Sequence, residues 1–158
     1  MFEQLFATHY PRVVSMLVRV TGTRARAEEI AADVFSKLAS QPKGGEDLLP
    51  WLYRTASNAG LDVARANARA RKLPAVPDRV EPEALDKLLQ AERDAKVRRV
   101  LGELKPRDAE LLLLRAEGMS YKELAAACEV SAGSVGTLLV RAEAEFARRY
   151  QARFGDRR

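Results

Sequence analysis

Residues 120–135, SYKELAAACEVSAGSV, contain the start signals of two helices in quick succession. Ser120 and Glu123 have the spacing of a capping box, in which each side chain accepts a hydrogen bond from a backbone N–H at the start of a helix. Ser131 offers a second N-cap, and Ala125 is small enough for two helices to cross closely. The pattern predicts a helix-turn-helix, whose second helix can enter the major groove of DNA, although an α-hairpin inside a helical bundle fits the same residues.

The rest of the chain also predicts an all-α fold, because apolar residues recur at helical spacing and no strand pattern is present. Thr23 is a good N-cap for the second helix, and Pro11 is expected to kink or break the first. Two glycines and a proline predict a loop over residues 41–46. Outside the helix-turn-helix, the expected helices cover residues 2–20, 24–40, 48–72, 83–104 and 106–118, and the last helix is expected to run through Arg149.

Residues 73–82, LPAVPDRVEP, contain three prolines. Because each proline disfavours helix at the residue before it, this segment is expected to be extended. The sequence therefore predicts two small helical domains, residues 1–73 and 83–158, joined by a flexible linker over residues 74–82. The helix-turn-helix belongs to the second domain.

The composition narrows the class of protein. Of the 158 residues, 47% are hydrophobic and 31% are charged, and the net charge of +5 is compatible with a polyanionic partner. No apolar run approaches the roughly 20 residues that span a bilayer, so we expect a cytoplasmic chain without membrane insertion. Cys128 lies among alanines and is expected to be a core residue, and a single His9 without a cluster predicts no metal or cofactor site. No nucleophile–base pair or phosphate loop is present, so an enzyme is not expected.

A row of polar residues, nearly all cations, follows one side of the helix expected at residues 48–72. At about 100° per residue, its members share an arc of about 60° opposite an alanine-rich face. This basic row consists of Arg54, Asn58, Arg65, Arg69 and Lys72. Charges of one sign repel each other along a helix, and such a row suits a phosphate backbone. Trp51, at the edge of the row, is either a platform for an exposed base or a half-buried core residue.

Several segments together resemble the extracytoplasmic-function group of bacterial sigma factors, both in order and in spacing. Residues 51–58, WLYRTASN, followed by Leu61-Asp62 and a basic run, resemble the W-L-Y-R-I-A-x-N motif of that group. Residues 27–35, AEEIAADVF, are similar to its A-E-D-L-V-Q-E-V-F motif. In the second half, residues 101–107, LGELKPR, and 118–125, GMSYKELA, resemble its L-x-x-L-P-x-R and G-x-S-Y-x-E-I-A motifs. The resemblance covers nearly the whole chain.

The resemblance implies an alternative sigma factor that binds core RNA polymerase and directs promoter recognition, melting of the −10 element and transcription initiation. It also implies an anti-sigma factor as regulator. The polymerase clamp would bind the helix that carries Glu28, Glu29, Asp33 and Phe35. The single-stranded −10 element would contact Trp51 and the basic row, with Asn58 and the loop at 41–47 holding a flipped base. The duplex −35 element would contact Ser131, Ser134, Thr137 and Arg141.

This chain departs from the family pattern at several positions. Ala32 replaces a glutamine of the clamp-binding helix, and Glu129 replaces a turn glycine, at a cost of about 1 kcal/mol if its φ is positive. Gly136, Leu138 and Glu143 stand where the recognition helix of the family usually carries basic residues. Because base reading by paired hydrogen bonds needs Arg, Lys, Asn or Gln, we expect phosphate contacts and DNA shape to contribute.

Two other classes of protein fit part of the sequence. A one-component regulator would bind duplex DNA with the helix-turn-helix alone, but its first half should then form a ligand pocket or a dimer surface instead of the basic row. A degenerate sigma-like adaptor, which would titrate an anti-sigma factor, fits the departures at Ala32 and Gly136.

Overall fold

The computed structural model describes residues 2–40, 48–70 and 82–155. Within these ranges the chain forms seven α-helices and one short 3-10 helix, and no strand. The elements are α1 (Phe2–Thr21), α2 (Arg24–Ala39), α3 (Leu48–Arg69), α4 (Pro82–Glu103), α5 (Pro106–Ala116), α6 (Tyr121–Cys128), η2 (Ala132–Ser134) and α7 (Val135–Phe154). The expected all-α fold class is confirmed.

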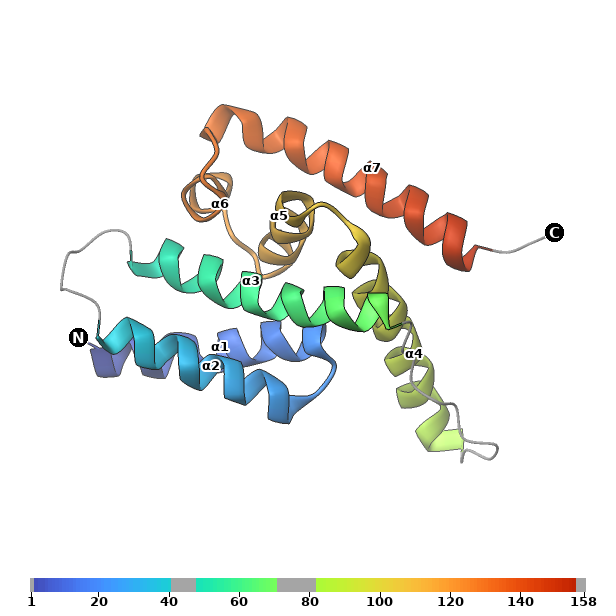
Figure 1. Cartoon of the computed structure of the whole chain (residues 1–158), viewed down its shortest axis with the longest axis horizontal. Helices are drawn as coiled ribbons and strands as arrows, with labels where there is room; N and C mark the ends of the chain where they lie inside the picture. Colours follow the sequence, from blue (N-terminus) through green and yellow to red (C-terminus); the bar gives the residue numbers. More distant parts are fainter. Residues whose placement is uncertain (1, 41–47, 71–81, 156–158) are drawn as a thin grey trace.

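The first three helices pack around a shared apolar core. In Figure 1, α1 and α2 lie side by side and α3 packs on both of them. The fully buried side chains of this core include Val13, Met16, Leu17, Val20, Leu52 and Leu61. Gly60 allows α3 to approach α1, because a Cβ at this position would lie 2.6 Å from Cγ2 of Val20. Because this face of α3 is buried against α1, the face that carries the basic row points away from the core of the first three helices.

The second half contains the helix-turn-helix, built by α6 and α7 with η2 between them and packed on α5. The hydroxyl of Ser120 accepts from the backbone N–H of Glu123 at 3.1 Å, and the Glu123 carboxylate accepts from the N–H of Ser120 at 3.0 Å. The predicted capping box is therefore confirmed. Glu129 ends α6 with a φ of 56°, in the left-handed region that costs a residue other than glycine about 1 kcal/mol.

The two halves are in contact in this structure. Figure 1 shows α5 and α6 between α3 and α7, with α4 against the far end of α3. A Cβ on Gly102 would lie only 2.4 Å from the carbonyl oxygen of Ala64, so the backbones of α4 and α3 touch here because residue 102 is a glycine. Arg19 of α1 forms an ion pair with Glu117, and Arg12 donates to the carbonyl oxygen of Glu117 at 3.3 Å.

Several local predictions are corrected by the structure. Helix α1 does not break at Pro11, because Pro11 is exposed while Tyr10 and Val13 on either side of it pack into the core. The hydroxyl of Ser131 makes no N-cap hydrogen bond; it lies 2.5 Å from the hydroxyl of Ser134 instead. Thr23 does cap α2, since its hydroxyl accepts from the N–H of Arg26.

The helix ends also differ slightly from the expected ones. α3 ends at Arg69, α4 begins at Pro82, and α7 continues to Phe154. The expected loop at 41–46, Lys72 of the basic row and residues 74–81 of the expected linker lie outside the described residues.

Across the ranges that the structure describes, no single helix has both the length and the apolarity needed to cross a bilayer. One pair of segments, Tyr121–Cys128 with Ala132–Phe154, meets the length and composition criteria together but is bent by 110°. Its apolar residues Leu124, Val135 and Leu139 are buried in the core.

Candidate nucleic-acid interface

The described members of the basic row differ in how much of each reaches the surface. Asn58 and Arg69 are exposed on α3, whereas Arg54 and Arg65 are partly buried by the second half of the chain. Trp51 is half-buried and packs against the core, as one of the two interpretations of its position expected. The structure therefore presents part of the row to solvent and covers the rest.

Arg54 is held by the helix-turn-helix. Its Nη1 lies 3.0 Å from the Glu129 carboxylate and donates to the carbonyl oxygen of Ala127 at 3.4 Å. Only 28% of the Arg54 side chain is exposed. A nucleic-acid phosphate cannot take these contacts until α6 moves away from α3.

Arg65 is covered at the other end of the row. Its Nη1 donates to Asp62 at 2.6 Å, and 20% of its side chain is exposed. Its Nε and Nη2 are buried and have no hydrogen-bond partner among the described residues. Buried guanidinium N–H groups without an acceptor are costly, so this arginine has bonding capacity that the fold leaves unused.

A buried carboxyl group lies where α5 faces α3. Glu110 is 8% exposed, and burial raises the pKa of its carboxyl group to about 7. Arg54 opposes this rise, and Glu129 adds to it. Cys128 lies nearby, and burial raises the pKa of its thiol to about 12, as expected for a core residue. No group of three His, Cys, Asp or Glu in the described parts of the chain is arranged to hold a metal ion.

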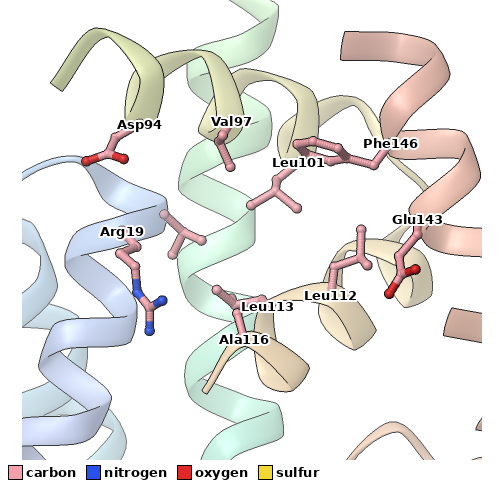
Figure 2. Close-up of a pocket in the computed structure, with 10 residues that line it drawn as sticks. Arg19, Asp94, Val97, Leu101, Leu112, Leu113, Ala116, Glu143 and Phe146 are labelled. Atoms are coloured by element: carbon pink, nitrogen blue, oxygen red, sulfur yellow. The ribbon is translucent and has the colours of Figure 1, made fainter. Parts of the chain in front are cut away.

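The contact between the halves is not filled everywhere. Figure 2 shows an apolar cavity of about 300 Å³ bounded by α1, α4, α5 and α7. Val97, Leu101, Leu112 and Phe146 line it from the second half, with Arg19 from α1. An interface that combines such a cavity with a few charge pairs resembles a separable domain contact more than a continuous core.

The residues expected to contact duplex DNA lie at the start of α7. Thr137 and Arg141 are exposed, while the hydroxyls of Ser131 and Ser134 are bonded to each other. Thr137 and Arg141 line an open hollow together with Tyr121, Gly133, Gly136 and Val140.

Val140 is a residue that sequence reasoning missed. It is 66% exposed, more than any other large hydrophobic residue that the structure describes. The two glycines beside it are not required by the fold: a Cβ at Gly133 would meet nothing within 4 Å, and one at Gly136 would make only ordinary contact with Tyr121. Because the two glycines have no side chains, another molecule can approach the backbone closely beside the exposed methyl groups of Val140. The helical spacing of residues 136, 137, 140 and 141 was the available signal.

The acidic residues expected to bind a protein partner lie on the outer face of α2. Glu28, Glu29 and Asp33 are exposed, and each pairs with a basic residue of the same helix. Phe35 is different, because it is 2% exposed and its ring packs edge-on against Phe6 at 5.2 Å. The structure corrects this prediction: Phe35 belongs to the core and is not part of the exposed surface of α2.

Comparison with known proteins identifies similar chains. Residues 5–70 match the family model of sigma-70 region 2, and residues 94–146 match that of sigma-70 region 4. The RNA polymerase sigma factor CarQ of Myxococcus xanthus is 31% identical over 147 residues, which cover 84% of this chain and 79% of CarQ. The ECF RNA polymerase sigma factor SigE of Mycolicibacterium smegmatis is 30% identical over 148 residues, covering 85% of this chain and 55% of SigE.

Among the solved structures with a similar fold is a bacterial sigma factor. It is the sigma factor RpoE of Bartonella quintana, crystallised in complex with the anti-sigma factor NepR. The similarity covers 93% of this chain and 94% of that chain, with a TM-score of 0.57 and 20% sequence identity. At this identity the similarity shows a shared fold.

Proposed function

Because this chain belongs to the extracytoplasmic-function group of the sigma-70 family, and so is an alternative sigma factor that directs transcription initiation, we propose that α3 and α7 bind the two promoter elements. The basic row of α3, with Trp51, contacts the single-stranded −10 element. The start of α7 contacts the duplex −35 element. The observation that supports this assignment is that each surface lies inside the matched region and presents exposed residues there, Asn58 and Arg69 on α3, Thr137 and Arg141 on α7.

The outer face of α2 is proposed to bind the clamp of core RNA polymerase. Glu28, Glu29 and Asp33 give this face a row of exposed carboxylates, whose ion pairs among the described residues are all with basic residues of α2 itself. Such a subunit supplies specificity, has no catalytic chemistry of its own and acts in the cytoplasm together with the polymerase.

Binding of the −10 element is proposed to require separation of the two halves. Arg54 is bonded to Ala127 and Glu129 of the helix-turn-helix, so it becomes available to DNA only when α6 leaves α3. An anti-sigma factor that holds the halves together would therefore keep Arg54 of the basic row covered.

The proposed function is tested by run-off transcription with core polymerase and a promoter library. The expected result is transcripts with defined starts, with Asn58→Ala relaxing the −10 preference and Arg69→Ala weakening use of all promoters. The matched control is Asn67→Ala, since residue 67 lies on the opposite side of α3 at about 100° per residue. Absence of any start site with active core polymerase would reject the assignment, and so would equal effects of Asn58→Ala and Asn67→Ala.

A further inference from the structure

A hollow lined by five arginines lies where α3, α4 and α7 meet, and its volume is about 440 Å³. The arginines are Arg65 and Arg69 from α3, Arg99 from α4, and Arg149 and Arg153 from α7. Among the described residues of the lining, the one carboxylate is that of Glu103. We propose that this hollow binds a compound that carries two or three linked phosphate groups.

Unpaired polar atoms concentrate at this hollow. Among the described residues, six buried side-chain nitrogen or oxygen atoms lack a hydrogen-bond partner, and four of them belong to Arg65, Arg99 and Glu103. The Arg99 side chain is only 9% exposed, and its Nε lies 3.7 Å from the Glu103 carboxylate, beyond hydrogen-bonding distance. Buried donors almost always have an acceptor in folded proteins, so these guanidinium N–H groups, which lie beneath the surface of the hollow, are left unsatisfied by the described residues.

The charge balance of the hollow favours a multiply charged anion. Glu103 pairs with Arg153, Asp62 with Arg65, and Glu145 with Arg149. These three carboxylates leave the five arginines with an excess of two positive charges, to which Arg69 contributes without an ion pair among the described residues. Guanidinium groups bind phosphate oxygens with two parallel N–H bonds, which makes phosphate the best-matched anion.

The size of the hollow favours a small ligand over a nucleic acid. A volume of about 440 Å³ lies within the range of small-molecule sites. A DNA strand on the basic row would also have to reach Arg54, about 16 Å further along α3, and that side chain is covered by Glu129 in this arrangement. The donors come from three helices, and linked phosphate groups offer more oxygens to reach them together than a single phosphate group does.

Such a ligand would hold the sigma factor closed. It would join α3 of the first half to α4 and α7 of the second, and it would occupy Arg65 and Arg69 of the basic row. This consequence rests on the proposed function, whereas binding itself rests only on the closed arrangement of the helices.

The binding is tested by isothermal titration calorimetry of the full chain with sodium tripolyphosphate, pyrophosphate, ATP and orthophosphate. Tripolyphosphate is expected to bind one to one, and orthophosphate at least tenfold more weakly. The double variant Arg149→Gln/Arg153→Gln should weaken tripolyphosphate binding at least tenfold. Arg93→Gln is the matched control, since Arg93 is exposed on α4 and bonds only to Gln90 among the described residues.

The outcomes separate the alternatives. If ATP binds as tightly as tripolyphosphate, the ligand source is a nucleotide, and a preference for the inorganic salts assigns an inorganic polyphosphate; both results support the site. The proposal would be overturned by any of three results: binding that does not saturate, equal weakening by Arg93→Gln, or no heat at millimolar ligand. The first two would show general charge attraction, and the third would mean that water satisfies the arginines of the hollow.

Two further measurements distinguish loss of binding from misfolding of the double variant. Circular dichroism of the double variant shows whether it folds, and the single variant Arg149→Gln repeats the test with a smaller change. If the original chain binds tripolyphosphate but gives no transcript with core polymerase, the proposed function alone is contradicted. If it gives transcripts but does not bind tripolyphosphate, this inference alone is contradicted.

Discussion

The carboxylate of Glu129 lies 3.0 Å from Nη1 of Arg54, and this contact joins the turn of the helix-turn-helix to the basic row of α3. Glu129 is also the only residue other than glycine with a positive φ in the described ranges. Glu129 therefore has two effects: its backbone conformation is unfavourable, and its carboxylate covers Arg54, which the proposed function needs for DNA binding.

Replacing Glu129 with glycine should make single-stranded −10 DNA bind more tightly. Loss of the carboxylate removes one of the two contacts that hold Arg54 against α6, an ion pair worth no more than about 1 kcal/mol, so we expect a gain of up to about fivefold. Fluorescence anisotropy with a labelled single-stranded probe measures it. Glu92→Gln, which removes one negative charge on α4, is the control and should leave the affinity unchanged. A weaker or unchanged affinity for Glu129→Gly would argue against the covering role of this pair.

Replacing Gly102 with alanine should push α4 away from α3. The new Cβ would lie 2.4 Å from the carbonyl oxygen of Ala64, so the helices must move apart at a cost of about 1–3 kcal/mol. We expect a lower free energy of unfolding by denaturant titration and a larger radius of gyration by small-angle scattering. Gly133→Ala meets nothing within 4 Å and serves as the control. A variant as compact and stable as the original chain would contradict the close packing of these two helices.

Glu110 should make the protein less stable as the pH rises from about 4.5 to 7. Its pKa in the folded protein is raised to about 7 by burial, against an ordinary value of 4.5, so the folded state holds a proton that the unfolded state has lost. The contribution of Glu110 to the free energy of unfolding is fully present below pH 4.5 and is lost as the pH rises through 7, a decrease of about 3 kcal/mol. The charges that face this group are Arg54, Arg65, Glu129 and, on its own helix, Arg107.

Glu110→Gln should remove most of this pH dependence, because the amide does not ionise. Urea titrations at pH 4.5 and pH 8 measure the effect, and the variant should gain stability relative to the original chain only at pH 8. Asp108→Asn, on the same helix, is the control and should retain the original slope. Parallel pH profiles for Glu110→Gln and the original chain would show that the carboxyl group does not titrate as proposed.

Val140 should recognise a thymine methyl group in the −35 element. Its exposed methyl groups offer apolar contact, and the C5-methyl of thymine is the apolar group of the major groove. Replacing the contacted thymine with deoxyuridine removes about 0.8 kcal/mol of burial, or about fourfold in affinity, for the original chain. Val140→Ala should make the protein insensitive to this change.

The measurement uses the −35 duplex selected by holoenzyme from a randomised pool, with each thymine replaced in turn. Val97→Ala, at a half-exposed valine of α4, is the control and should retain the sensitivity to deoxyuridine. If Val140→Ala discriminates the two duplexes as well as the original chain, or if the selected element contains no thymine, Val140 does not read this group.

Local signals predicted much of the fold. Ser120 with Glu123 specified the start of α6, and the glycine-rich turns and helical spacing placed most helices within a few residues, because these signals depend only on neighbouring positions. Pro11 was misjudged because core packing on both sides keeps α1 continuous. Phe35 was assigned to a surface because a sequence motif does not show which side of α2 faces the aromatic residues of α1.

The candidate site could be predicted only as separate pieces. The spacing of Asn58 and Arg69 is enough to place them on one face of α3. The covering of Arg54 depends on a contact with Glu129, 75 positions further along the chain, and no local pattern encodes such a contact. The exposure of Val140 was missed for a different reason: its helical spacing with Thr137 and Arg141 was a local signal, but a valine in a helix is ordinarily expected to be buried.

The ion pairs between Arg19 and Glu117 and between Arg54 and Glu129 give ionic strength two opposing effects. Added electrolyte weakens the attraction of DNA phosphates to the basic row, but it also screens the pairs that keep the halves together. The measured dependence of promoter affinity on electrolyte concentration should therefore be shallower than the number of phosphate contacts alone would give. Counting contacts from that slope would underestimate the size of the DNA interface.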